Sequence, residues 1–501
     1  MPGKTVRAER GVVASEQALA STAGYEVLRR GGNAFDAAVA TSFALAVTFH
    51  PAGGIGGDFF GMLYEAKTGK VHCINASGWS PSGLTLELAR SAGRGSIPRF
   101  GATTCMVPGF VAGVWEMHRR FGSEEFRELL SAAVGYAANG FPAGEGLCRS
   151  TSAAFAELSE DAKRVFAPSG RPPTAGEWIR QEALGRAISD VADAGPDAFY
   201  AGRPAELIRS ALEELGVTSR PADFRDFKPE WASPLSLDYK GVQVFEVPPN
   251  SMGATSLLIL KKLSEGGLAG AGPLSKRRIE ATMEAVVPAY ARRDEMLGDP
   301  RFGDIDVERF IGSPLVAARR NSRVGQGDTT AFSLADSEGN LVSGIQSLFN
   351  HFGSRVFVGG CGLMLNNRGS GFSLSGPNKV EPGKRPLHTL SSMILERDGR
   401  PFLAIGASGG DHRPLQHAQF VTNAVDYAMP VDLNVGHPRF LWNGSDSVLV
   451  EEGYELPEGG PFNVRSLPMP GPTGVCQGVQ VSDRCLTGVC DVRGDGMPAG
   501  F

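Results

Sequence analysis

The sequence predicts an α+β fold in which layers of helices lie against β-sheet. Helical patterns dominate the first half of the chain, strand patterns dominate from Thr329 onward, and a further helix follows among these strands. This order favours stacked layers over a repeating βαβ series. With 501 residues, of which 42% are hydrophobic and 21% charged, the chain can bury a large core without disulfides or metal ions.

Composition also limits the class of function and the compartment. A net charge of −5 offers no basic surplus for binding phosphate backbones, so we expect no nucleic-acid partner. Seven cysteines, an odd and small number, are typical of a reducing compartment, so we expect a cytoplasmic protein. The first ten residues predict no secretory signal, and the apolar stretch 34–49 is short for a bilayer and contains Asp36, so we expect no membrane partner.

The first elements follow from capping residues and turns. A helix is predicted over 15–30, with Ser15 as its cap and two glycines after its end. Asn33 is expected to cap a second, buried helix that reaches Phe49. A hairpin is predicted from strands at 59–64 and 70–75.

Helical patterns separated by short breaks continue through 111–215. The remaining elements are expected to be, in order, a glycine-rich loop at 266–272, a helix at 277–295, strands at 330–335, 341–347 and 402–405, a helix at 416–428, and strands with turns over 475–501.

Two candidate nucleophiles stand out. Residues 406–410 fit the pattern Gly-x-Ser-x-Gly after an apolar strand, so Ser408 could be the nucleophile of an elbow, with Asp426 or Asp432 and His437 completing a triad. The alternative is a glycine turn whose backbone N–H groups bind a ligand or an oxyanion.

The second candidate is Thr329, which follows Gly325-Gln-Gly-Asp328. A threonine hydroxyl needs a base, and a threonine at a chain terminus can use its own α-amine. Thr329 is internal, so this chemistry requires cleavage of the Asp328–Thr329 bond.

Cofactor and metal motifs are absent from the sequence. It contains no Walker A motif, no Gly-x-Gly-x-x-Gly between a strand and a helix, and no His-Glu-x-x-His. Cys476, Cys485 and Cys490 lie near one another but form no Cys-x-x-Cys pair. We therefore expect neither a metal nor a cofactor.

Across nearly its whole length the chain resembles the γ-glutamyltranspeptidase family of N-terminal-nucleophile hydrolases. The motifs that carry the resemblance lie in the family's order: Gly31–Ala40, Gly54–Asp58, Val107–Gly109, Phe199–Gly202, Val247–Ser251, Arg292–Asp294, Gly298–Pro300, Leu365–Asn367, Pro382–Pro386 and Gly406–Gly410. The resemblance implies a four-layer αββα sandwich. It also implies a precursor that cleaves itself into a large segment, 1–328, and a small segment, 329–501, which together form one unit and a heterodimer that could assemble further.

The resemblance also assigns roles in catalysis. It implies that Thr329 is the nucleophile, that Gly409 and Gly410 supply the oxyanion hole, and that Ser347 hydrogen-bonds in the environment of the nucleophile. Ser408 then becomes a loop residue. The implied reaction is acylation of Thr329 by a small-molecule amide and transfer of the acyl group to water or an amine, with no cofactor.

The chain departs from the family where the γ-glutamyl group would bind. The family's amine-binding aspartate corresponds to Gly371, its carboxylate-binding arginine to Ser77, its paired serines to His388-Thr389, and its asparagine beyond Ser347 to Phe349. We therefore expect a small acyl or carboxyl-bearing amide as the substrate, with a γ-glutamyl compound as the alternative.

The local sequence around residues 367–389 resembles a divergent branch of the family that contains oxamate amidohydrolase-like proteins. Arg368 or Arg385 could hold a carboxylate, with His388 beside them, and Trp79 could form a wall of the pocket; structural ion pairs and core packing are the alternatives. An unprocessed relative that only binds its ligand remains a hypothesis of another class.

Overall fold

Two β-sheets stack face to face in the computed structural model, which describes residues 1–325, 327–457, 459 and 461–501. One seven-stranded sheet has the order β1 (Lys4–Ala8), β20 (Leu486–Cys490), β19 (Cys476–Val481), β15 (Arg400–Ala407), β14 (Met393–Arg397), β9 (Val242–Glu246) and β8 (Leu235–Tyr239). The other has the order β21 (Ala499–Gly500), β2 (Val12–Ser15), β10 (Asp328–Ala335), β11 (Leu341–Phe349), β3 (Asp58–Glu65), β4 (Lys70–Ala76) and β7 (Glu230–Ala232).

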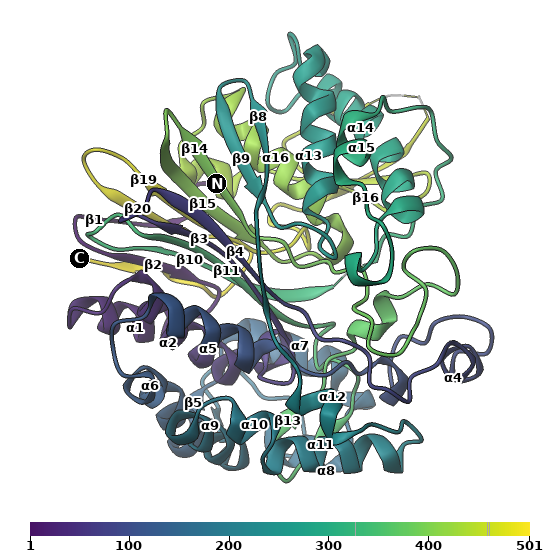
Figure 1. Cartoon of the computed structure of the whole chain (residues 1–501). Coiled ribbons are helices and arrows are strands. Elements are labelled where there is room, and N and C mark those ends of the chain that lie inside the picture. The colour runs from purple at the N-terminus through teal and green to yellow at the C-terminus, as the bar shows by residue number, and fades with distance from the viewer. Residues whose placement is uncertain (326, 458, 460) are drawn as a thin grey trace.

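Helices cover the outer face of each sheet (Figure 1). The sheet of β10 is covered by α1 (Ala18–Arg29), α2 (Ala34–Thr48) and α5 (Phe110–Phe121), with α6 (Phe126–Asn139) and α9 (Glu182–Ala194) outside them. The sheet of β15 is covered by α13 (Gly253–Lys262), α14 (Lys276–Met296), α16 (Arg413–Val425) and α17 (Val431–Gly436). The predicted four-layer αββα sandwich is confirmed.

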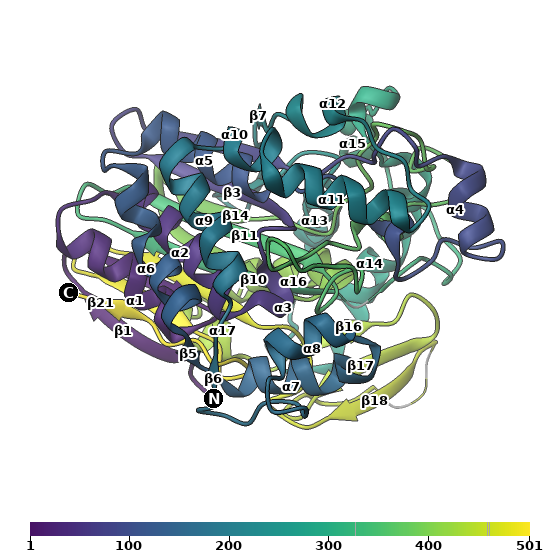
Figure 2. The same ribbon diagram turned by 90° about the horizontal axis from the view of Figure 1, so that it is seen from below.

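Smaller elements surround these layers (Figure 2). The further helices are α3 (His50–Gly53), α4 (Leu86–Ala92), α7 (Glu145–Ala154), α8 (Glu160–Phe166), α10 (Asp197–Tyr200), α11 (Arg203–Glu214), α12 (Pro221–Arg225) and α15 (Val307–Gly312). The minor strands are β5 (Phe141–Pro142), β6 (Trp178–Ile179), β12 (Phe357–Val358), β13 (Leu363–Met364), β16 (Phe440–Trp442), β17 (Ser447–Glu451) and β18 (Asn463–Leu467).

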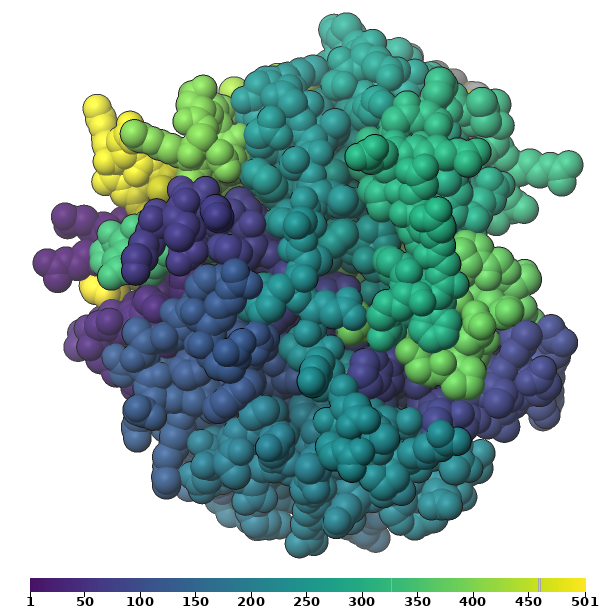
Figure 3. Space-filling view, viewed as in Figure 1, coloured from purple at the N-terminus to yellow at the C-terminus, as the bar shows by residue number. Residues whose placement is uncertain are grey.

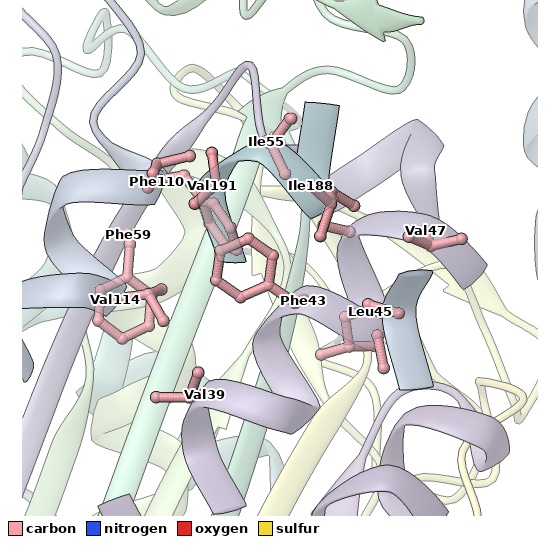
Figure 4. Close-up of a cluster of buried hydrophobic side chains, with 14 of the residues drawn as sticks. Val39, Phe43, Leu45, Val47, Ile55, Phe59, Phe110, Val114, Ile188 and Val191 are labelled. Carbon is pink, nitrogen blue, oxygen red and sulfur yellow. The ribbon is translucent and has the colours of Figure 1, made fainter. Parts of the chain in front are cut away.

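The helix α2 is the centre of the core beneath the sheet of β10. Asn33 caps it, and Asp36 completes a reciprocal capping box with Asn33. All 15 residues of α2 are buried, as a helix that is apolar on every side requires. Figure 4 shows Phe43 of this helix among the buried side chains of its neighbours, and its ring lies 5.1 Å from that of Phe110.

Each of the two large sheets combines strands that precede position 328 in the sequence with strands that follow it. β10 and β11 lie between β2 and β3, and β15 and β14 lie between β19 and β9. Figure 3 shows purple segments from the start of the sequence and yellow segments from its end on the same flank of the molecule. Strand pairing therefore joins segments 1–328 and 329–501 through extensive backbone hydrogen bonding.

Two expectations about the first half of the chain are wrong. Ser15 does not cap α1: it belongs to β2 and pairs with Phe332, and Gln17 caps the helix by accepting hydrogen bonds from Leu19 and Ala20. The first half also supplies seven strands to the two large sheets, although only the hairpin of β3 and β4 was predicted there. The short strands β1 and β2 are defined by pairing with distant residues, which local patterns do not reveal.

Candidate functional site

Thr329 lies at the start of β10, where a bulge interrupts pairing with β11. Its side chain is 1% exposed. The carbonyl oxygen of Asp328 accepts a hydrogen bond of 2.7 Å from the Ser347 hydroxyl, and the Phe349 N–H donates to that hydroxyl over 2.7 Å. The two hydroxyl oxygens of Thr329 and Ser347 are 3.2 Å apart.

The direction of these hydrogen bonds is fixed by chemistry. A carbonyl oxygen only accepts and a backbone N–H only donates, so Ser347 uses its single proton on Asp328. The Thr329 hydroxyl must then donate to Ser347. Ser347 thereby connects the Thr329 hydroxyl with the Asp328 carbonyl.

A glycine turn follows β15 beside Thr329. Gly409 and Gly410 have φ angles of 138° and 58°, which disfavour other residues. A Cβ on Gly409 would lie 2.6 Å from Nε2 of Gln416. The turn therefore depends on glycine, and its residues Ser408 and Gly409 line the cavity that contains Thr329.

Ser408 lines the same cavity but has a structural partner. Its Oγ accepts a hydrogen bond of 2.8 Å from the Val475 N–H. Asp426 instead accepts a hydrogen bond from Tyr239, and the Nδ1 of His437 donates to Pro438. Within the described residues, no hydrogen bond joins Ser408 to the partners that a nucleophile elbow would require.

The chain just before Asp328 lies against this turn. The Asp411 N–H donates to Gly325 over 3.0 Å, and the Gly325 N–H donates back to the Asp411 carboxylate over 2.8 Å. A Cβ on Gly327 would lie 2.9 Å from the Phe349 ring and 3.0 Å from the Cα of Gly410. The space beside Gly410 and Phe349 is thus occupied by Gly327, two residues before Thr329.

Arg368 and His388 form one buried cluster with Asp58. The Arg368 Nε is 3.5 Å from Asp58, and its guanidinium lies 4.2 Å from the centre of the Phe349 ring. The Nε2 of His388 donates to Asp58 over 3.0 Å while its Nδ1 accepts the Leu390 N–H, which defines a neutral ring. Burial, reinforced by the Arg368 charge, lowers the pKa of His388 to about 3.

Arg385 and Trp79 lie elsewhere. Arg385 forms an ion pair of 2.7 Å with Glu230. The Trp79 indole donates to the Asp223 carbonyl over 2.9 Å, and its ring packs on Phe227. In the described ranges, neither lines the cavity at Thr329. Arg368 and His388 thus share Asp58 as a partner, although among the described residues neither of them lines this cavity either, whereas Arg385 and Trp79 have other partners.

Arg413 is a candidate that the sequence reasoning missed. It begins α16, three residues after Gly410, and is fully buried. Its Nε donates to Ala407 over 2.8 Å, but neither terminal nitrogen has a hydrogen-bond partner among the described residues. Burial and the nearby Arg368 charge lower its pKa to about 9. The Arg-Pro pair at the start of a helix appeared ordinary in the sequence.

A cavity of about 360 Å³ opens at Thr329. Its walls include Glu16, Arg149, His351, Gly409 and Asp495. In the part of the chain that the structure describes, no group of three or more His, Cys, Asp or Glu side chains is placed to hold a metal ion. Likewise, none of the described helices is both long and apolar enough to cross a bilayer.

The sandwich, with a threonine at the start of a central strand facing a glycine turn, defines the class of N-terminal-nucleophile hydrolases. The family model described as gamma-glutamyltranspeptidase matches residues 20–501. The chain belongs to this family, and it is an enzyme of the hydrolase and transferase type.

Individual relatives differ in the activity that their names give. The chain is 35% identical over 454 residues to the glutathione hydrolase-like YwrD proenzyme of Bacillus subtilis, covering 88% of this chain and 86% of that protein. It is 30% identical over 473 residues to the oxamate amidohydrolase proenzyme of Klebsiella pneumoniae, covering 89% and 88%. The cephalosporin acylase structure from Bacillus halodurans matches 99% of this chain and 97% of its own, with a TM-score of 0.91 and 29% identity.

Proposed function

We propose that the protein is a self-processing amidohydrolase that uses Thr329 as an N-terminal nucleophile. The observation that carries this proposal is the hydrogen bond from Ser347 to the Asp328 carbonyl, with the Thr329 hydroxyl directed at Ser347. Donors to a carbonyl stabilise the negative charge that develops on its oxygen during attack. The arrangement thus favours attack at the bond that must break.

Self-cleavage of the chain would then proceed in two steps, formation of an ester and its hydrolysis. The Thr329 oxygen attacks the Asp328 carbonyl carbon, the peptide C–N bond breaks, and the hydroxyl proton passes to the nitrogen. Water hydrolyses the resulting ester, which gives Asp328 a carboxylate and restores the Thr329 hydroxyl. The freed α-amine becomes the base for later turnovers, because its ordinary pKa lies near neutral pH. The two fragments remain joined as a heterodimer through both sheets.

The same nucleophile would cleave the substrate. Thr329 attacks the amide carbonyl, the amine leaves with a proton from the α-amine, and water or another amine accepts the acyl group. Gly409 and Gly410 would supply N–H groups to the oxyanion, since Gly409 lines the cavity that contains Thr329 and Gly410 follows it in the same turn.

For the acyl group we propose a small carboxylate-bearing amide. Arg368 and Arg413 are both fully buried, and each has two nitrogens without a hydrogen-bond partner in the described ranges. Unpaired buried donors require a partner, and a carboxylate satisfies guanidinium groups well. Asp58 already contacts the Nε of Arg368, which leaves its Nη2 and both terminal nitrogens of Arg413 for the ligand.

The residues at the positions where the family binds the γ-glutamyl group do not match the two charges of that group. Ser77 hydrogen-bonds to Asn250 over 3.2 Å, and Gly371 provides no carboxylate for an α-ammonium group. A charge left buried and unpaired would cost about 3–5 kcal/mol. We therefore expect γ-glutamyl compounds to be poor substrates, although the names of several relatives refer to glutathione hydrolysis.

A kinetic panel on the processed enzyme tests this function. Oxamate, simple acyl amides, glutathione and γ-glutamyl-p-nitroanilide should be compared at equal concentrations. Higher kcat/KM for the carboxylate-bearing amides supports the proposal, while high kcat/KM for either γ-glutamyl compound overturns the choice of substrate. A protein that remains one chain and hydrolyses nothing would support the non-catalytic hypothesis.

We further propose a cytoplasmic location, supported by seven free cysteines.

A further inference from the structure

Glu16 lies in the wall of the cavity that contains Thr329. It follows β2, whose pairing with β10 aligns Ser15 with Phe332 and brings Glu16 close to Thr330. Glu16 is only 5% exposed, and its Oε2 has no hydrogen-bond partner among the residues that the structure describes. A buried carboxyl group without a full set of partners is costly, so this oxygen needs a donor.

The surroundings of Glu16 are acidic. Asp328 and Asp495 line the same cavity, and buried Asp491 also acts on Glu16. Burial and these three carboxylates raise the pKa of Glu16 well above its ordinary value, although the neighbouring Thr330 hydroxyl acts in the opposite direction. The site therefore favours a proton or another positive charge.

The nearby basic groups do not supply that charge. His351 lies 3.3 Å from Asp328 rather than against Glu16, and burial lowers its pKa. The Arg493 guanidinium is held by Glu451 and Asp491. Arg149 approaches Asp495 at 3.9 Å, but its side chain is 62% exposed at the rim. Burial lowers the pKa of His412 to about 4, which leaves its ring neutral at pH 7. Within the described residues, no ion pair involves Glu16.

We propose that this cavity binds the amine component of the reaction and selects amines that carry a second, cationic nitrogen, with Glu16 as the partner of that ammonium group. The proposal rests on the proposed acyl-enzyme at Thr329. The carboxylate of the acyl group would lie toward Arg368 and Arg413, whereas the cation would lie in the acidic cavity. Opposite charges on the two sides of the nucleophile would thus orient the two halves of the amide.

Transfer of the acyl group from Thr329 to the amine needs no further reactant. The neutral end of a diamine attacks the ester carbon of acyl-Thr329, a new C–N bond forms, and the C–O bond to Thr329 breaks. The attacking nitrogen loses a proton, which returns through the α-amine to the Thr329 oxygen. The distal ammonium group remains bound to Glu16 throughout, and a cavity of about 360 Å³ can hold a short diamine.

Acceptor competition on the processed enzyme tests the proposal. The acyl donor is the best carboxylate-bearing amide from the kinetic panel, and the acceptors are putrescine, butylamine and γ-aminobutyrate, which have similar lengths and different distal groups. The ratio of amide product to hydrolysis product should be highest with putrescine. Glu16→Gln should reduce that advantage by about 10-fold to 100-fold, the usual effect of losing a hydrogen bond to a charged group.

Controls separate this inference from the function on which it rests. Glu26→Gln changes a carboxylate on α1 that is 59% exposed, and it should leave the putrescine advantage unchanged. Equal ratios for putrescine and butylamine in the unaltered enzyme would overturn the inference even if Glu16→Gln did not fold. A loss of hydrolysis and transfer by the same factor in Glu16→Gln would also overturn it, because Glu16 would then serve the α-amine of Thr329. No hydrolysis of any donor by processed enzyme would instead refute the proposed function.

Discussion

Replacing Ser347 with alanine should slow self-cleavage far more than it destabilises the fold. The hydroxyl donates to the Asp328 carbonyl over 2.7 Å and is the acceptor for both Thr329 and the Phe349 N–H. Loss of one donor to a developing oxyanion lowers a rate by about 10²–10³-fold, or about 2.7–4 kcal/mol. The buried Phe349 N–H also loses its partner, which should cost about 1–3 kcal/mol of folding stability.

The assay is the time course of cleavage of freshly synthesised precursor, followed by denaturing gel electrophoresis. Ser347→Ala should accumulate as a single chain that cleaves slowly, while Ser347→Thr should keep most of the rate because it retains a hydroxyl group. Circular dichroism of both variants would check that they fold. Cleavage of folded Ser347→Ala at the rate of the unaltered protein would refute the role assigned to this hydroxyl.

Four further predictions follow from the site and the core. Ser408→Ala should leave processing and most activity intact, as measured by gel and by hydrolysis, because the Ser408 hydroxyl has a structural partner, the Val475 N–H, from which it accepts a hydrogen bond. Gly410→Ala should lower kcat by about 10²–10³-fold, since its φ of 58° disfavours alanine and the oxyanion donor would move. Arg413→Gln should raise KM for carboxylate-bearing amides but not for neutral amides, as parallel kinetics would show. Burial lowers the pKa of His50 to about 3, so as the pH falls the unfolded chain binds a proton at this residue before the folded protein does. The contribution of His50 to folding stability should therefore be full above about pH 6.5 and decline toward pH 3. His50→Gln should make the urea midpoint fall less steeply between about pH 7 and pH 5.

The parts of the fold that sequence predicts best are those with local chemical signals. Asn33 and Asp36 mark the start of α2 through their reciprocal cap. Asp336 shapes the turn between β10 and β11 by accepting N–H groups from Glu338 and Asn340. The hairpin of β8 and β9 had a comparable signal in the turn at Lys240 and Gly241, both with positive φ, but its strands were not recognised.

The site was less predictable because distant packing creates it. Glu16 is an ordinary acidic residue in the sequence, and it becomes buried only where β2 approaches β10 and the segment around Asp495. Arg413 becomes exceptional only because its terminal nitrogens are enclosed without partners in the described structure. The role assigned to Ser347 came from family resemblance, since no local pattern relates it to Thr329.

The mass and N-terminal sequence of the fragments test the central claim most directly. Purified protein should yield a small fragment that begins Thr-Thr-Ala-Phe-Ser, corresponding to residues 329–501. Thr329→Ala should remain one chain, because no hydroxyl can then attack the Asp328 carbonyl. An intact folded chain, a fragment with a different first residue, or a cleaved Thr329→Ala protein would contradict the proposal that Thr329 is a self-generated N-terminal nucleophile.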